Sequence, residues 1–245
     1  MPGRMQTLID TATPYWDVEA EIARRFYKNA KRSDHAFYLR AQLWKELNPV
    51  DGFFNGLHRE LTKAANMFPR VGKNIDRHDY LFLLEQLVSE YNHFVLLADI
   101  LEYIQGRKIS KEDLKQLPQE KKLAEIRRSF VKKGGPIGKA AVGITEGGGT
   151  ALFRVAKNLK GSKINEMTAR AMRVIWNDEK QHYLVQAKEA AKVVKTSNDM
   201  KIMKSAIVDV SIQRVWMRNE MFMEPMAKEE IKKFLGRRRR KLASS

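Results

Sequence analysis

The sequence predicts an all-α protein, and three observations lead to this expectation. Apolar residues recur with a helical period along nearly the whole chain, and no segment alternates convincingly with the period of two that strands need. Pro and Gly are few, at seven and 14 of 245 residues, whereas a sandwich or barrel with many turns would contain more. No linker is long enough to separate two domains, so we expect one all-α domain over residues 1–245.

Capping and turn residues mark the ends of most of the expected helices. In chain order these helices cover about 17–31, 34–48, 52–67, 77–105, 110–132, 137–159, 163–194 and 197–235. Ser33-Asp34 and Asp51 are helix-capping residues at the starts of the second and third segments, and Gly106 ends the fourth. Acidic residues after Ser110 indicate a helix start, and Gly134-Gly135-Pro136 is a strong break before the sixth segment.

Composition excludes several classes of site and favours certain partners. The absence of Cys removes disulfides, thiolate metal sites, iron–sulfur clusters and cysteine nucleophiles. Lys and Arg number 46 against 29 Asp and Glu, and the net charge of +17 favours an anionic partner. No apolar run reaches the length of about 18 residues that a membrane span needs, and the N-terminus lacks the apolar stretch of a secretory signal. A cytoplasmic location is expected.

Basic residues concentrate in the tail 237–241, in the segment 120–133 and in Lys188, Lys192 and Lys195. We expect the tail to be disordered and solvated, as most charge runs are. These segments keep open an alternative in which the chain is a metal-free helical protein that binds nucleic acid or an anionic membrane. These segments lack the regular interleaving of aromatic residues that stacking on bases would need.

Two Glu-x-x-His pairs lie on otherwise apolar helix faces. In the segment 77–105, Glu90 belongs to an apolar row, and His93 follows three residues later, so both side chains leave one face of the helix. Glu179 and His182 repeat this spacing in the segment 163–194. A helix with such a face is buried, so the four side chains are expected inside the protein.

Single carboxylates on two further helices complete an ordered set. Glu60 lies on the apolar face of the segment 52–67, and Glu146 lies on an apolar stripe of the segment 137–159. Each is followed by a Glu-x-x-His pair at a distance that suits two antiparallel helices, and residues 106–135 supply a long crossover between the halves. If a different helix provides the first carboxylate, Glu46 or Glu21 takes the place of Glu60.

The chemistry that suits such a set is metal binding. Buried carboxylates repel one another and resist desolvation, whereas two divalent cations bring four positive charges and two imidazoles add neutral ligands. Oxygen and nitrogen donors with open coordination positions suit iron or manganese. For any single buried Glu in so basic a chain, pairing with Arg is the alternative.

The ordered set resembles the ferritin-like, carboxylate-bridged di-iron superfamily, in which two helices each give one Glu and two others each give Glu-x-x-His. The resemblance covers about 52–194 and implies a four-helix bundle with a long crossover. The helices within 17–48, the helix 197–235 and the basic tail 236–245 then lie outside this core. The resemblance also implies a role for each residue. Glu60 and Glu146 would be single ligands, Glu90 and Glu179 would bridge the metals, and His93 and His182 would be terminal ligands.

The activity that the resemblance implies is oxidation or oxygenation of a substrate by O2 at two iron ions, or at one iron and one manganese. The expected partners are a small-molecule or anionic substrate and an electron donor, and a homodimer is a further expectation. A ferroxidase or iron-handling protein is the alternative.

The glycines 147–149 leave three explanations open: they open a pocket beside the metals, they allow close helix packing, or they mark the start of a helix. Asp178 and Tyr183 are candidates for contacts to the ligands, and no general acid or base is identified.

Overall fold

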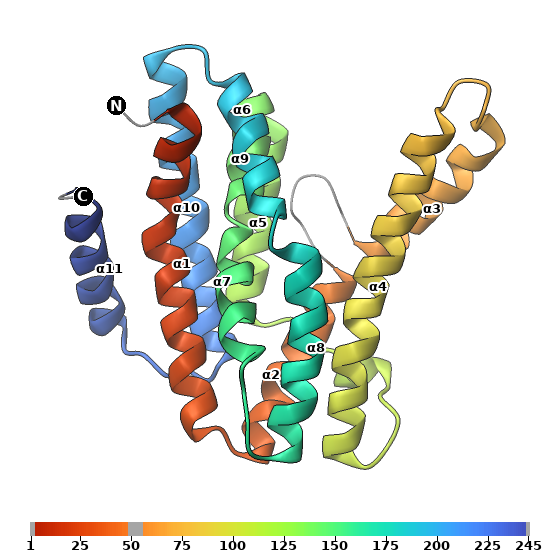
Figure 1. Ribbon diagram of the computed structural model, residues 1–245, viewed down its shortest axis with the longest axis vertical. Helices are drawn as coiled ribbons and strands as arrows, with labels where there is room; N and C mark the ends of the chain where they lie inside the picture. Colours follow the sequence, from red (N-terminus) through yellow and green to blue (C-terminus); the bar gives the residue numbers. More distant parts are fainter. Residues whose placement is uncertain (1–2, 49–55, 244–245) are drawn as a thin grey trace.

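The computed structural model describes residues 3–48 and 56–243, and helices account for most of these residues (Figure 1). No strand occurs within the described ranges, where the only β contact is an isolated bridge between Val71 and Ile75. The all-α prediction is therefore confirmed. None of the described helices combines the length and the apolar content needed to cross a bilayer.

The helices agree in outline with the expected segments. They are α1 (Arg4–Asn29), α2 (Arg32–Leu47), α3 (Leu57–Met67), η1 (Phe68–Arg70), α4 (Arg77–Gln105), η2 (Lys111–Asp113), α5 (Pro118–Lys133), α6 (Gly135–Ile144), α7 (Gly147–Ala156), α8 (Lys163–Glu179), α9 (His182–Val193), α10 (Ser197–Met221) and α11 (Lys228–Ala243). Asp76 caps α4 by accepting the N–H groups of His78 and Asp79, and Gly106 ends it in the left-handed region at φ 72°. Asp51, expected as a cap, lies outside the described residues.

Helix α1 begins much earlier than the expected start at residue 17. Its first turns bury Leu8 and Ala12 in a cluster that also contains Ala187 of α9 and Ile207 of α10. This contact with distant helices stabilises the first turns of α1. Tertiary packing therefore extends the helix beyond what the local pattern indicates.

Four expected helices are each interrupted, and two of the interruptions adjoin predicted metal ligands. The segment 110–132 is divided by residues 114–117 into η2 and α5. The segment 137–159 breaks at Thr145 and Glu146, between α6 and α7, and the segment 163–194 breaks at residues 180–181, between α8 and α9. The segment 197–235 breaks after α10, where Met223 and Glu224 have positive φ. The expectation of continuous helices there is wrong, because the spacing of apolar residues does not reveal a break between two helices that both bury an apolar face.

The central helices form a long bundle, from which an arm projects (Figure 1). Helix α1 packs on α7 and α10, while α4 packs on α2 and α8 through its C-terminal half. The arm consists of α3 and the N-terminal half of α4, with a small core of its own that includes Leu57, Ala64, Tyr80 and Leu87. The helix beside α4 in the bundle is thus α2, and the packed core extends beyond the predicted range 52–194.

The basic tail is helical and lies against the bundle. Residues 237–241 belong to α11, which packs along α1. Arg238 Nε lies 3.2 Å from Asp17 Oδ2, and Arg239 contacts the hydroxyl of Tyr15. The expectation of a disordered tail is therefore wrong, because acidic and aromatic side chains of α1 give these arginines partners.

Candidate metal centre

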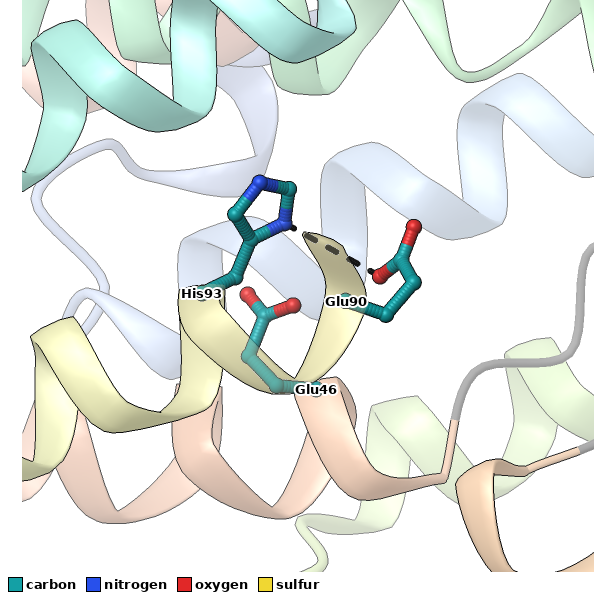
Figure 2. A group of neighbouring side chains, drawn as sticks. All are labelled: Glu46, Glu90 and His93. Atoms are coloured by element: carbon teal, nitrogen blue, oxygen red, sulfur yellow. Dashed lines mark ion pairs between the residues drawn. The ribbon is translucent and has the colours of Figure 1, made fainter. Parts of the chain in front are cut away.

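Helices α2 and α4 bring together three side chains that suit a metal ion. Glu46 of α2 and Glu90 and His93 of α4 each offer a ligand atom, and these atoms all lie within 4.8 Å of one another (Figure 2). The i, i+3 spacing directs Glu90 and His93 from one face of α4, so that His93 Nδ1 lies 3.9 Å from Glu90 Oε2. His93 is almost fully buried, at 1% exposure, and Glu46 is also buried.

Glu179, the last residue of α8, lies between two histidines. Its Oε1 is 4.0 Å from His93 Nδ1, and its Oε2 is 2.8 Å from Nδ1 of His182, the first residue of α9. One carboxylate therefore faces imidazoles from two other helices, one with each oxygen. The two Glu-x-x-His pairs, which are 89 residues apart in sequence (179 − 90), meet at this carboxylate.

Asp178 fixes the tautomer of His93. Asp178 Oδ2 lies 3.0 Å from His93 Nε2, and an ionised carboxylate only accepts hydrogen bonds, so Nε2 carries the proton. In a neutral imidazole Nδ1 then carries the lone pair, on the side that faces Glu90 and Glu179. A carboxylate behind a ligating imidazole is a frequent arrangement at metal sites. Tyr183, the other predicted neighbour, packs edge-on against Trp16 instead.

The break between α8 and α9 leaves the His182 side of the group accessible. The side chain of His182 is 49% exposed, whereas that of His93 is 2% exposed. The hydrogen bond to Glu179 raises the pKa of His182 above its usual range, and the negative charges of Glu146 and Asp178 act in the same direction against burial. The group is thus shielded from solvent at His93 and accessible to solvent at His182.

Glu146 has arginine partners. Its Oε1 lies 2.5 Å from Arg127 Nη2, and its Oε2 accepts from Arg214 Nη1 at 3.2 Å. Burial by itself would raise the pKa of Glu146, but the charges of Arg127 and Arg214 outweigh it and lower this pKa. For Glu146 the structure shows the arginine pairing that the sequence left as the alternative.

A buried polar network behind this pair reaches Glu46. Arg214 also donates to Glu19 of α1, which receives a further bond from Arg218 at 3.3 Å. Arg218 Nη1 donates to Gln42 Oε1 at 2.7 Å, and Gln42 Nε2 donates to Glu46. Sequence reasoning missed this network, although Arg214 and Arg218 lie among buried apolar residues of α10 at an i, i+4 spacing that indicates a shared buried face.

Glu60 lies in the arm and is absent from the Glu46–Glu90–His93 group. It belongs to α3, and its Oε2 is 3.5 Å from Lys63 Nζ one turn further along the same helix. Helix α3 packs on the N-terminal half of α4, whereas α2 packs beside the half that carries His93. The place predicted for Glu60 is occupied by Glu46, one of the two alternatives that the sequence offered; the other, Glu21, pairs with Arg24 and Arg25.

The glycines after Glu146 allow close packing between α7 and α1. A Cβ on Gly147 would lie 2.5 Å from the Trp16 ring, and one on Gly148 would lie 1.9 Å from Glu19 Oε1. Helix α7 also begins at Gly147. The packing and helix-start explanations therefore account for these residues, and the space beside them is filled by Trp16 and Glu19.

Comparison of the chain with models of protein families finds no match, and comparison with curated proteins finds none either.

Proposed function

We propose that this protein holds two divalent metal ions, iron or an iron–manganese pair, and uses them with O2 to oxidise a substrate. The observation that carries the proposal is the position of Glu179, whose two carboxylate oxygens face His93 and His182. A carboxylate between two imidazoles brings oxygen and nitrogen donors from three helices together, and the resemblance to di-iron carboxylate proteins points to the same chemistry.

The residues fit such a centre by charge and by donor type. Glu46, Glu90, His93, Glu179 and His182 would hold the two metals. Three carboxylates and two neutral imidazoles offer oxygen and nitrogen donors that suit iron and manganese. The bound metals would supply the redox chemistry with O2 that these side chains lack. Glu60 and Glu146 are not part of the proposed ligand set, because Lys63 and the arginines accompany them.

The surrounding residues orient the ligands. Asp178 accepts the Nε2 proton of His93 and so keeps the Nδ1 lone pair directed at the centre. Arg218 donates to the amide oxygen of Gln42, which forces the amide nitrogen of Gln42 towards Glu46. Glu19 holds Arg218 in place, and Gly148 leaves the space that this carboxylate fills.

Access to the proposed centre is from the side of α9. His182 is half exposed, and the neighbouring Asp178 is 37% exposed at its side chain, whereas His93 and Glu46 are buried. A substrate and O2 would therefore reach the centre from the side of His182, while the buried end excludes water. An anionic substrate suits the net charge of +17, and its identity stays a prediction.

The test is the metal content of protein purified from iron-replete cells, measured by elemental mass spectrometry. We expect about two metal ions per chain, as two-metal sites require, and consumption of O2 when the iron(II)-loaded protein is exposed to air. Glu46→Ala is expected to lose metal while keeping its helicity, and Glu60→Ala, a change of the same kind in the arm, is expected to keep both metals.

Wild-type protein without bound metal, after growth and reconstitution with iron(II), would overturn the proposal. Equal metal loss in the two Glu→Ala variants would overturn the assignment of Glu46. Large assemblies that hold many iron atoms per chain would replace the oxidase by the iron-handling alternative.

A further inference from the structure

Helix α4 presents a row of large apolar side chains to solvent. Leu81, Leu84, Val88, Tyr91 and Val95 are between 37% and 70% exposed, and Val88 is the most exposed of them. Single exposed apolar residues are common, but a contiguous row of this kind marks a surface that another molecule covers.

The row follows the spacing of a coiled-coil seam. Its members alternate between steps of three and four residues, which places them at the a and d positions of consecutive heptads. Helical geometry puts Glu90 and His93 on the other side of α4, where the helix meets the bundle. The row is therefore separate from the proposed metal centre.

The charge of α4 disfavours nucleic acid and anionic lipid as the covering molecule. Residues 78–106 contain neither Lys nor Arg, in a chain whose net charge is +17. The exposed residues beside the row include Glu85, Asn92 and Asp99. A polyanion would meet acidic residues here, so the face suits another protein surface.

We propose that α4 pairs with α4 of a second copy of this chain, in antiparallel orientation, with a twofold axis at Val88. The members of the row lie three and seven residues after Val88 and four and seven residues before it. The row is therefore nearly symmetric about Val88, and two antiparallel copies can place their rows against each other. In this register Leu81 lies at the level of Val95 of the second copy, and Leu84 lies within one residue of the level of Tyr91. Arg77 then lies at the level of Asp99 of the second copy, which gives opposite charges at both ends of the seam.

The first test is the oligomeric state by analytical ultracentrifugation. Wild-type protein is expected to be a dimer in the micromolar range, and Val88→Lys is expected to be a monomer because two ammonium groups would meet at the axis. Val88 is exposed, so this substitution leaves the fold and the metal content unchanged. Gln86→Lys, an exposed position on another side of α4, is the matched control and keeps the dimer.

The second test uses the absence of Cys from the chain. Val88→Cys is expected to form a disulfide-linked dimer under mild oxidation, because the axis brings the two Cα atoms into the range of roughly 4.4–6.8 Å that a disulfide spans. Gln86→Cys is expected to remain unlinked. Arg77→Glu is expected to weaken the dimer, and addition of Asp99→Arg to restore it, which only the antiparallel register explains.

Monomeric wild-type protein throughout the micromolar range would overturn the proposal, and so would equal cross-linking of the two Cys variants. Binding of monomers to phosphatidylcholine vesicles that Val88→Lys abolishes would assign the row to a lipid surface instead. Loss of the dimer in Val88→Lys with full metal content leaves the proposed metal centre untouched. The two proposals therefore fail separately.

Discussion

Two adjoining parts of the protein interior hold carboxylates in different ways. The arginine cluster comprises Glu19, Glu146, Arg127, Arg214 and Arg218. The histidine cluster comprises Glu46, Glu90, Asp178, Glu179, His93 and His182. In the first, guanidinium groups of the chain itself lie against the carboxylates. In the second, Glu179 and Asp178 lie against imidazoles, which are neutral unless they are protonated.

The difference indicates where a cation from solution belongs. A buried carboxylate needs a compensating positive charge, since its desolvation is otherwise costly. The arginine cluster carries that charge permanently, whereas the histidine cluster offers neutral nitrogen ligands and oxygen donors to a metal. The same basic chain thus uses arginine where it needs a fixed structure and leaves histidine where we propose that metals bind.

The largest effect is expected from Arg214→Met. This change removes the guanidinium that joins Glu19 to Glu146, and breaking a buried ion pair costs about 3–5 kcal/mol. The free energy of unfolding of metal-free protein in urea measures the loss. Arg24→Met, which removes a surface partner of Glu21, is the control and is expected to cost less than about 1 kcal/mol. Similar losses in both variants would remove the distinction between the arginine cluster and a surface pair.

Glu146→Gln and Glu179→Gln test the boundary between the two clusters. Glu179→Gln is expected to lose metal, because the neutral amide is a poor bridge between two cations. Glu146→Gln is expected to keep its metal but to lose about 1–3 kcal/mol of stability, since Arg127 and Arg214 lose their anion. Metal analysis and urea unfolding of both variants give the answer. Metal loss in Glu146→Gln would move this residue into the histidine cluster, as the sequence predicts.

Gln42→Leu tests the connection between the clusters. The amide of Gln42 joins Arg218 to Glu46, and its removal is expected to weaken metal binding about 10- to 100-fold, as loss of a hydrogen bond behind a ligand typically does. Competition with a chelator measures the affinity. Gln86→Leu, an exposed change on α4, serves as the control. An unchanged affinity in Gln42→Leu would mean that Glu46 keeps its position without this bond.

The smallest effects are expected in the pH dependence of the stability of metal-free protein. The arginines lower the pKa of Glu146, so the stability that it contributes is present above the ordinary value of 4.5 and is lost as the pH falls. Glu179 raises the pKa of His182, so this contribution is present below 6.5 and is lost as the pH rises through the folded-state pKa. The contribution of the arginine cluster to stability therefore decreases as the pH falls, and that of the histidine cluster decreases as the pH rises.

Urea unfolding across the pH range checks this contrast. Glu146→Gln is expected to flatten only the acidic side of the profile, and His182→Gln only the side above pH 6.5. If both substitutions flattened the same side of the pH profile, the carboxylates of the two clusters would not have separate positive partners.

Local sequence patterns predicted the features that one helix determines. The i, i+3 spacing of Glu90 and His93 requires no distant contact, and the structure has both on one face of α4. The same pattern did not reveal the break after Glu179, because residues 180–181 carry no Gly or Pro to mark it. It also did not distinguish α3 from α2 as the neighbour of His93, since each has a buried Glu on its inner face.

Composition and the geometry of single helices are enough to predict that the chain is helical, that it is strongly basic and that two histidines stand three residues after a Glu. They do not predict the contacts between helices that join Glu46 to Glu90 and His93 or that bring arginines to Glu146. Such partners lie far apart in the chain, as with Glu19 and Arg214 at a separation of 195 residues. Their meeting is fixed by the packing of whole helices, which no local period encodes.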